Sequence, residues 1–143
     1  IRKRVPDIAI TTDVIVGFPG ESEVDFLISK KFIKEIKFSR LHVFSFSAHK
    51  KTPAYSMDNQ VDQKVISKRA NSLRFQGEEL EVEYKKLFAD KELEVIVENP
   101  YKGETKMKTE YYFDIVDSEY GFNESEIGKI KNVVFCLNKD NMV

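Results

Sequence analysis

The spacing of hydrophobic residues predicts a strand, a helix and a second strand in the first third of the chain. Residues 8 to 18 form an apolar, β-branched run, and one alternate set of its side chains is the more apolar: Ile10, Thr12, Val14 and Val16. Apolar residues recur at helical spacing from Ser22 to about Lys37, around more than half of the circumference, which is typical of a helix packed between a sheet and neighbouring helices. A second alternating run, Arg40 to Phe46, completes a strand–helix–strand crossover.

A glycine–proline–glycine turn joins the first strand to the helix. Gly17 and Gly20 suit backbone conformations that larger residues resist, and Ser22 with Asp25 has the spacing of a capping box. In α/β proteins, ligands bind where such loops follow parallel strands. The glycines could equally serve only to shape a tight connection, so the turn by itself does not establish a site.

The period of the pattern changes along the second half of the chain. Helical spacing predicts one long helix, or two helices broken near Gly77, from a single apolar stripe: Ile66, Ala70, Leu73, Gly77, Leu80, Tyr84 and Leu87. From Glu92 the period is two, and further strands are expected at about 105 to 117 and 128 to 138. Several short strands separated by turns predict a small antiparallel β-barrel.

Composition supports a folded α/β plus β chain in three parts. A length of 143 residues with 41% hydrophobic content is enough for a core. Residues 1–58 are expected to hold the strand–helix–strand unit, residues 59–90 a helical linker, and residues 91–143 the β-barrel.

Charge argues against a strong nonspecific nucleic-acid binder, because such proteins neutralise many phosphates at once. The formal net charge is −1, and residues 91–143 carry 7 basic and 11 acidic side chains. Any RNA contact must therefore be local.

The single cysteine, Cys136, cannot form an internal disulfide and cannot by itself hold an iron–sulfur cluster. It lies in the apolar run Val133–Leu137 and is expected to be a small buried core residue. A lone cysteine also favours a reducing compartment. No apolar segment approaches the roughly 20 residues that span a bilayer, so we expect a cytoplasmic protein without a membrane partner.

Several motifs, in order, resemble those of the radical S-adenosylmethionine methylthiotransferases, which insert a methylthio group into tRNA or a ribosomal protein. The segment from Thr12 to Ser22, TDVIVGFPGES, resembles the family's fifth strand and loop, and Phe38–Ser47 resembles the next strand. Further matches lie in the segment that follows this second strand, which resembles the segment that leaves the family's catalytic barrel: Lys51-Thr-Pro-Ala54, Gln60-Val61 and Lys68-Arg69. Leu41-His-Val-Phe44 is most similar to the branch that modifies threonylcarbamoyladenosine beside the anticodon.

The resemblance implies a fold and a parent enzyme. Residues 1–58 would be the last two βα units of a partial TIM-like barrel, and residues 91–143 a TRAM-like domain that binds tRNA. The family's cluster-binding cysteines lie upstream of these motifs. Because the chain starts at Ile1 without a methionine, it is interpreted as a C-terminal fragment, inactive alone, whose partner is the N-terminal remainder of the same polypeptide. S-adenosylmethionine and 4Fe-4S clusters would be bound by the full-length enzyme, and we expect none bound to this fragment.

Candidate cofactor residues follow from the strand faces together with the resemblance. In a barrel the more apolar face packs on the outer helices, which would direct Asp13 and Ile15 into the lumen. The wall of the adenosyl site is expected to include Asp13, Ile15, Gly17, Phe44 and Phe46. Asp13 could instead only bond to neighbouring strands. His42, without a second ligand or carboxylate motif nearby in sequence, is more simply structural than a general base or metal ligand. Upstream of Thr52, His49 and Lys51 replace the arginine and glycine of the family pattern S-x-R-x-G-T-P-A.

The final third interleaves cations with aromatic residues, which is the chemistry of phosphate contact and base stacking. The residues expected to contact a tRNA anticodon stem-loop are Tyr101, Lys102, Lys106, Lys108 and Tyr111. Thr109 and Tyr112 match the family's G-x-T-x-N-Y pattern, whereas Met107 and Tyr111 depart from it. A hairpin core with solvated lysines is the alternative. For the whole protein, the alternatives to a tRNA methylthiotransferase are a noncatalytic RNA-binding module and a methylthiotransferase that acts on a ribosomal protein.

Overall fold

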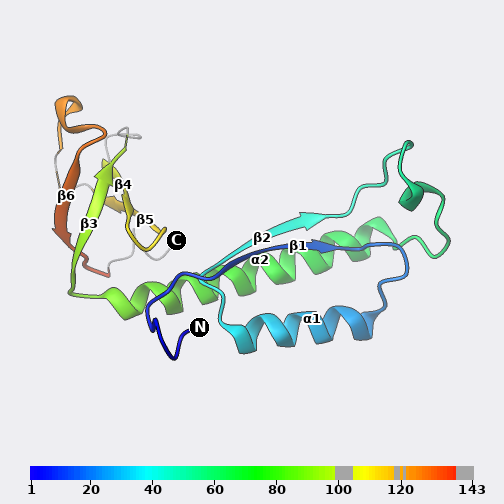
Figure 1. The fold of residues 1–143 in the computed structure, drawn as a ribbon. Helices are drawn as coiled ribbons and strands as arrows, with labels where there is room; N and C mark the ends of the chain where they lie inside the picture. Colours follow the sequence, from blue (N-terminus) through cyan, green and yellow to red (C-terminus); the bar gives the residue numbers. More distant parts are fainter. Residues whose placement is uncertain (99–104, 118–119, 121, 138–143) are drawn as a thin grey trace. The chain divides into compact units, whose positions relative to one another are not determined.

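A computed structural model describes residues 1–98, 105–117, 120 and 122–137 of the chain (Figure 1). The chain divides into two compact units: Ile10–Glu81, called here the α/β unit, and Ile1–Ala9 together with Val82–Val143, called the β unit. The observed architecture is therefore a small α/β unit and an antiparallel sheet, in agreement with the class expected from the hydrophobic pattern.

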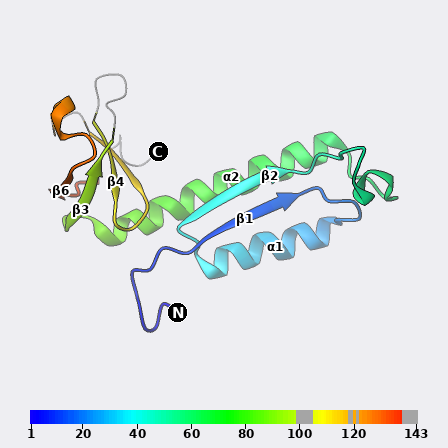
Figure 2. The same ribbon diagram turned by 45° about the horizontal axis from the view of Figure 1, so that its top comes forward.

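The α/β unit is built on two parallel strands. β1 (Thr11–Val16) pairs in parallel with β2 (Arg40–Ser45), and α1 (Glu23–Ile36) connects them. The long helix α2 (Gln63–Lys85) begins in this unit and runs alongside the strands (Figure 2). One face of the sheet packs with both helices in a single core: Val16, Phe26, Ile33, Ile66, Ala70, Leu73 and Leu80, with Val14, Leu41 and Val43 packed against it.

Local sequence explains where α1 begins and ends. The predicted capping box is confirmed: Ser22 Oγ accepts a hydrogen bond from the Asp25 N–H at 3.2 Å, and the Ser22 N–H donates to the Asp25 carboxylate at 3.0 Å. At the other end Lys37 adopts φ 54°, and its N–H donates to the Ile33 carbonyl.

The alternative of a break near Gly77 is wrong, because α2 is one helix of 23 residues. Gly77 is buried, and a Cβ at this position would lie 3.3 Å from Leu41 Cβ, so glycine lets the helix approach β2 closely. The predicted stripe is buried as far as Tyr84. Leu87, however, is 49% exposed, because the chain tightens into a 3₁₀ turn at Lys86–Phe88 that buries Phe88 instead.

The β unit contains a four-stranded antiparallel sheet in the order β5-β4-β3-β6. Its strands are β3 (Glu92–Val97), β4 (Thr105–Thr109), β5 (Asp114–Asp117) and β6 (Ile130–Val134). The expectation of a strand through residues 105 to 117 is wrong at its centre, since the chain turns between β4 and β5 and Tyr112 has φ 66°. Inward side chains form an aromatic-rich core: Tyr84, Phe88, Leu93, Val95, Met107, Phe113, Ile115, Val133 and Phe135.

Cys136 is exposed, which corrects the expectation of a buried core cysteine. β6 ends at Val134, and the alternation beyond it buries Phe135, so that Cys136 lies on the opposite side of the backbone. Among the helices that the structure describes, none is both long enough and apolar enough to cross a membrane.

Tyr84 links α2 to the N-terminal segment and should make stability sensitive to alkaline pH. Its hydroxyl donates to the Asp7 carbonyl at 2.8 Å, and burial, with the nearby Asp7 charge, raises the pKa of Tyr84 from 10.0 to about 12. The stabilising contribution is thus complete below pH 10 and is lost as the pH rises through about 12. Tyr84→Phe should lower the free energy of unfolding by about 1 kcal/mol at neutral pH, measured by urea denaturation.

The difference in unfolding free energy between Tyr84→Phe and the unsubstituted chain should become smaller as the pH is raised from 10 toward 12. Tyr112→Phe is the matched control, because Tyr112 is 73% exposed and its replacement should change stability little at any pH. A difference for Tyr84→Phe that stays constant over this pH range would contradict the assignment.

Candidate functional site

One face of the parallel sheet is exposed and carries most of the expected cofactor residues. Asp13 is directly opposite His42 in the strand pairing, and Ile15 is opposite Phe44. Asp13 and His42 are exposed, and Ile15 and Phe44 are 59% and 52% exposed. The predicted division of the strand into two faces is confirmed, since Val16 is buried on the other side. The structure thus brings Asp13, Ile15 and Phe44 together on one surface.

Two further aromatic side chains lie at the carboxyl end of this sheet. The rings of Phe18 and Phe46 meet edge to face, with centroids 5.2 Å apart. The Phe46 N–H donates to the Val16 carbonyl at 2.8 Å, which continues the strand pairing by one residue. Phe46 therefore lies at the end of the sheet that follows Ile15 and Phe44, where loops of α/β proteins hold ligands.

Gly17 is held by contacts on the helix side of the sheet. It has φ 81°, and a Cβ at this position would lie 2.3 Å from Ile66 Cγ1 of α2. Its N–H donates to the Glu21 carboxylate at 2.7 Å. Both the backbone conformation and the close approach of α2 therefore require glycine here, and any ligand contact of Gly17 must come from atoms other than its N–H.

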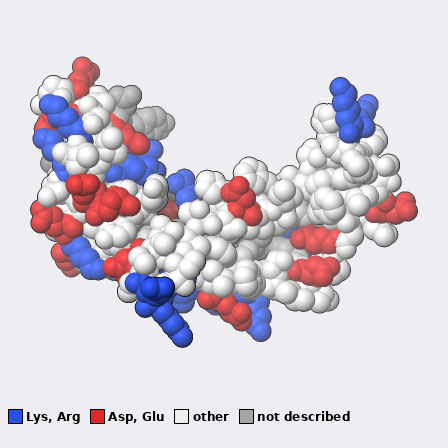
Figure 3. Space-filling model, in the orientation of Figure 1, with Lys and Arg blue, Asp and Glu red and all other residues white. Residues whose placement is uncertain are grey.

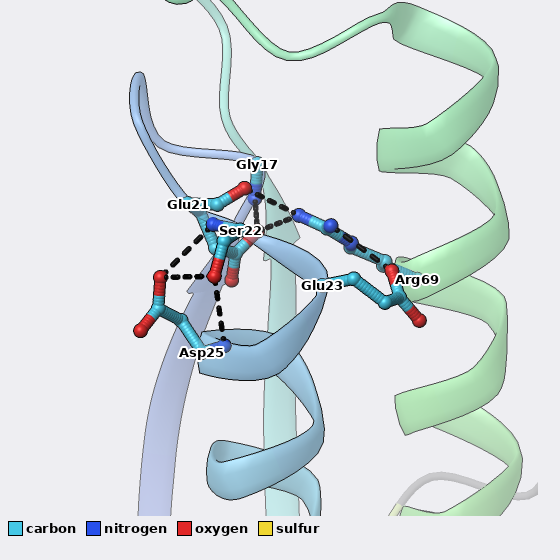
Figure 4. Close-up of polar contacts among 6 residues, drawn as sticks. All are labelled: Gly17, Glu21, Ser22, Glu23, Asp25 and Arg69. Atoms are coloured by element: carbon cyan, nitrogen blue, oxygen red, sulfur yellow. Dashed lines mark hydrogen bonds and ion pairs between the residues drawn. The ribbon is translucent and has the colours of Figure 1, made fainter.

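A buried ion pair fixes the turn between β1 and α1 (Figure 4). The guanidinium of Arg69, whose side chain is 6% exposed, donates from one nitrogen to the Glu21 carboxylate at 2.7 Å and to the Glu21 carbonyl at 3.0 Å. Its other terminal nitrogen donates to the Glu23 carboxylate at 3.1 Å. Burial alone would lower the pKa of Arg69, but the hydrogen bonds that Arg69 donates to Glu23 and Glu21, with the charges of these carboxylates, outweigh it, and the pKa is raised above its ordinary value. Arg69 therefore stays charged and ties the turn to α2.

Sequence reasoning missed the pairing of Glu21 with Arg69, although a signal for it exists. Arg69 lies three residues after Ile66 and next to Ala70, on the buried stripe of α2. A charged residue at an inward-facing helical position needs an opposite charge nearby. Glu21, in the loop before α1, supplies such a charge. No local sequence pattern, however, connects two residues that are 48 positions apart.

Two of the cations expected to contact RNA, Lys106 and Lys108, form ion pairs with carboxylates. Lys106 forms ion pairs with Glu98 at 3.1 Å and Asp114 at 3.5 Å, and Lys108 pairs with Asp114. The Glu98 hydrogen bond and the charge of Asp114 raise the pKa of Lys106. Burial would raise the pKa of Asp114, but the Lys108 hydrogen bond and the charges of Lys108 and Lys106 outweigh it, so this pKa is lowered.

Tyr111 is also engaged by the β unit itself. Its ring lies against Phe88, with centroids 4.2 Å apart, and it packs on the core of the unit. Tyr101 and Lys102 lie outside the residues that the structure describes. The contacts of Lys106, Lys108 and Tyr111 place them within the hairpin and its core, and each would have to exchange a contact in order to bind RNA.

Among the residues that the structure describes, no group of three or more histidine, cysteine, aspartate or glutamate side chains could hold a metal ion. The described residues accordingly do not fit an iron–sulfur cluster.

Comparison with known proteins gives relatives of one chemical class, although no family model matches the chain. The chain is 40% identical over 135 residues to the threonylcarbamoyladenosine tRNA methylthiotransferase MtaB of Bacillus subtilis. It is 35% identical over 133 residues to the tRNA-2-methylthio-N(6)-dimethylallyladenosine synthase of Alkaliphilus oremlandii. Each of these matches covers 93% of the chain.

A third relative acts on a protein. The chain is 39% identical over 114 residues, 80% of its length, to the ribosomal protein uS12 methylthiotransferase RimO of Carboxydothermus hydrogenoformans. The chain spans only 26 to 30% of the length of these three relatives.

Gly17→Ala should destabilise the α/β unit more than Gly20→Ala. An alanine at position 17 meets both the cost of positive φ and the contact with Ile66, so we expect a loss of about 2–4 kcal/mol in unfolding free energy. Gly20 has φ 89° but open space around a Cβ, so only the conformational cost of about 1–2 kcal/mol applies. Urea denaturation of both variants measures the difference, and equal losses would show that Ile66 does not restrict position 17.

Arg69→Ala should lower the unfolding free energy by about 3–5 kcal/mol, because it leaves the part-buried Glu21 carboxylate unpaired. Arg69→Lys should recover little, since a single ammonium cannot reproduce the forked contacts to Glu21 and Glu23. The control is Lys68→Ala, an exposed neighbour on α2, expected to change stability by no more than about 0.5 kcal/mol. Similar stabilities for the two alanine variants in urea denaturation would overturn this account of the turn.

Proposed function

Because this chain belongs to the methylthiotransferase family of the MiaB, MtaB and RimO type, we propose that it is the C-terminal part of a tRNA methylthiotransferase. The proposed substrate is threonylcarbamoyladenosine beside the anticodon. The match to MtaB, at 40% identity over 93% of the chain, and the similarity of Leu41–Phe44 to that branch support this choice. We place the parent enzyme in the cytoplasm, consistent with the single cysteine of this chain, which cannot form an internal disulfide.

We propose a place in the parent fold for each part of the chain. β1, α1 and β2 within residues 1–58 would be the last two βα units of a partial TIM-like barrel. Residues 59–90 would lead to a TRAM-like β-barrel in residues 91–143. Support comes from the parallel pairing of β1 with β2 and from the antiparallel order of the second sheet.

The observation that carries the function is the exposed face of β1 and β2. Ile15 and Phe44 are neighbours across the strand pairing and offer apolar surface of the kind that adenine and ribose contact. Asp13, one step earlier on the same face, offers a carboxylate for ribose hydroxyls, and Phe46 extends the aromatic surface at the carboxyl end. Gly17 would contribute through the shape of its turn. These residues would orient the adenosyl group and keep water from one side of it.

S-adenosylmethionine, when bound, would supply the methyl group and the reactive carbon-centred radical of the reaction. The 4Fe-4S clusters of the parent enzyme would be held by its N-terminal remainder, because the described residues here do not fit them. This chain would therefore contribute binding and orientation, and the fragment alone would be inactive.

RNA contacts in the β unit remain part of the proposal: Tyr101, Lys102, Lys106, Lys108 and Tyr111. Lys106 and Lys108 occupy alternate positions of β4 and so share one face of the sheet, which supports a common role. Their ion pairs with Glu98 and Asp114 would have to be replaced by phosphate contacts.

Deletion of the gene should remove one modified nucleoside from tRNA. Mass spectrometry of digested tRNA should show loss of the methylthio form of threonylcarbamoyladenosine and accumulation of the unthiolated form. The methylthio form of isopentenyladenosine and the modification of protein uS12 serve as internal controls and should not change. Loss of one of these two modifications instead would show that the substrate is isopentenyladenosine in tRNA or protein uS12, respectively, and not threonylcarbamoyladenosine.

In the parent enzyme, Ile15→Ala and Phe44→Ala should each raise the KM for S-adenosylmethionine by about tenfold, with a smaller effect on kcat. Loss of a large apolar contact of roughly 1.5 kcal/mol corresponds to a factor of about ten. Leu27→Ala on α1 is the matched control, since Leu27 is 53% exposed but lies outside the proposed wall. Steady-state kinetics with equal KM values for all three variants would remove this face from the cofactor site.

A further inference from the structure

The segment after β2 lies beside the turn that follows β1. Because β1 and β2 are parallel, their carboxyl ends meet at the same edge of the sheet. Residues 46–62 leave β2 at this edge and return to α2. The Gly20 N–H donates to the Asn59 carbonyl at 2.9 Å, which ties this segment to the β1–α1 turn. The segment that contains His49, Lys50 and Lys51 therefore starts from the same end of the sheet as the proposed adenosyl wall.

Hydrogen bonds hold this segment in a defined conformation. The Thr52 N–H and hydroxyl both donate to the His49 carbonyl, at 2.9 and 2.8 Å. A 3₁₀ turn follows at Pro53–Ser56, and the Gln60 amide donates to the carbonyls of Ala54 and Met57, each at 2.9 Å. Lys50 and Lys51 are therefore presented from an internally bonded turn.

Lys50 and Lys51 keep their charges available. Both are exposed, and within the described part of the chain neither ammonium forms an ion pair. Figure 3 shows a group of basic side chains at the end of the α/β unit that this segment forms. Lys106 and Lys108 differ, because carboxylates already neutralise them. A lysine without a protein partner binds phosphate with release of counterions and breaks no ion pair in doing so.

We propose that Lys50 and Lys51 bind backbone phosphates of the RNA substrate, at the edge of the α/β unit that carries the adenosyl wall. The inference rests on the proposed function, which supplies RNA as the partner. A net charge of −1 means that any RNA contact must be local, and the inference places one such contact on a surface that the cation-and-aromatic pattern of the final third did not indicate. Bound there, the RNA would have its phosphates held at the same edge of the sheet as Ile15 and Phe44.

The test is binding of the 143-residue chain to a fluorescently labelled anticodon stem-loop, measured by anisotropy over a series of salt concentrations. Each phosphate contact contributes about 0.7 to 0.9 to the slope of log affinity against log salt. Lys50→Ala with Lys51→Ala should therefore reduce the slope by about 1.4 to 1.8 and weaken binding on the order of tenfold or more at 0.1 M salt. Lys50→Arg with Lys51→Arg should retain the slope.

A double variant of equal charge serves as the control. Lys34→Ala with Arg40→Ala removes two exposed cations at the opposite edge of the α/β unit, near the end of α1 and the start of β2, and should leave the slope nearly unchanged. An equal loss in both double variants, or an unchanged slope for the Lys50 and Lys51 variant, would overturn the inference.

Two further outcomes separate this surface from the proposed function. A slope reduced only by Lys106→Ala, Lys108→Ala and Tyr111→Ala together would move the RNA contact to the β unit and overturn the assignment to Lys50 and Lys51. Absence of stem-loop binding at low salt would overturn it as well. In either case the nucleoside analysis of the deletion strain still decides whether the parent enzyme modifies tRNA.

Discussion

The close approach of α2 to the end of β1 is the constraint on which the α/β unit depends. Ile66 occupies the space that a side chain at position 17 would need, and Arg69, one turn later, binds the Glu21 carboxylate that also receives the Gly17 N–H. The turn is thereby held from the helix side of the sheet by packing and by charge together. These contacts all lie on one side of the sheet. Ile15 and Phe44 lie on the other face, are more than half exposed, and do not take part in the contacts that hold the turn.

Much of the α/β unit follows from local pattern, because local physics determines it. Strand alternation separated the face of Asp13 and Ile15 from the face that packs on the helices, and the Ser22 capping box identified the start of α1. The break considered at Gly77 could not be judged in sequence, since a helical glycine serves close packing as readily as a break, and the partner Leu41 is 36 residues away. Cys136 was misplaced because an uninterrupted apolar run does not reveal which of its alternate side chains face the core.

The candidate RNA surfaces show a second limit of sequence reasoning. A count of cations and aromatics treats every lysine as equivalent, whereas the structure separates lysines that have carboxylate partners from those that do not. Lys106 and Lys108 are paired because β5 folds back on β4 and brings Asp114 beside them. A hairpin was the alternative considered from the sequence, but the strand pattern did not show which acidic residue would lie next to these lysines. Lys50 lies in an irregular segment with no periodic signal, so its place beside the β1–α1 turn became visible only with the parallel strand pairing.

The sheet of the α/β unit has two open edges, and this affects how the chain behaves when it is produced alone. Among the described residues, β1 and β2 pair only with each other, so each has one edge without a strand partner. Parallel sheets ordinarily have neighbours on their edges and cover on both faces. Unprotected edges flanked by apolar side chains such as Ile15 and Phe44 are templates for strand addition. Self-association of the chain should therefore rise with its concentration, through backbone pairing between the strand edges of two copies.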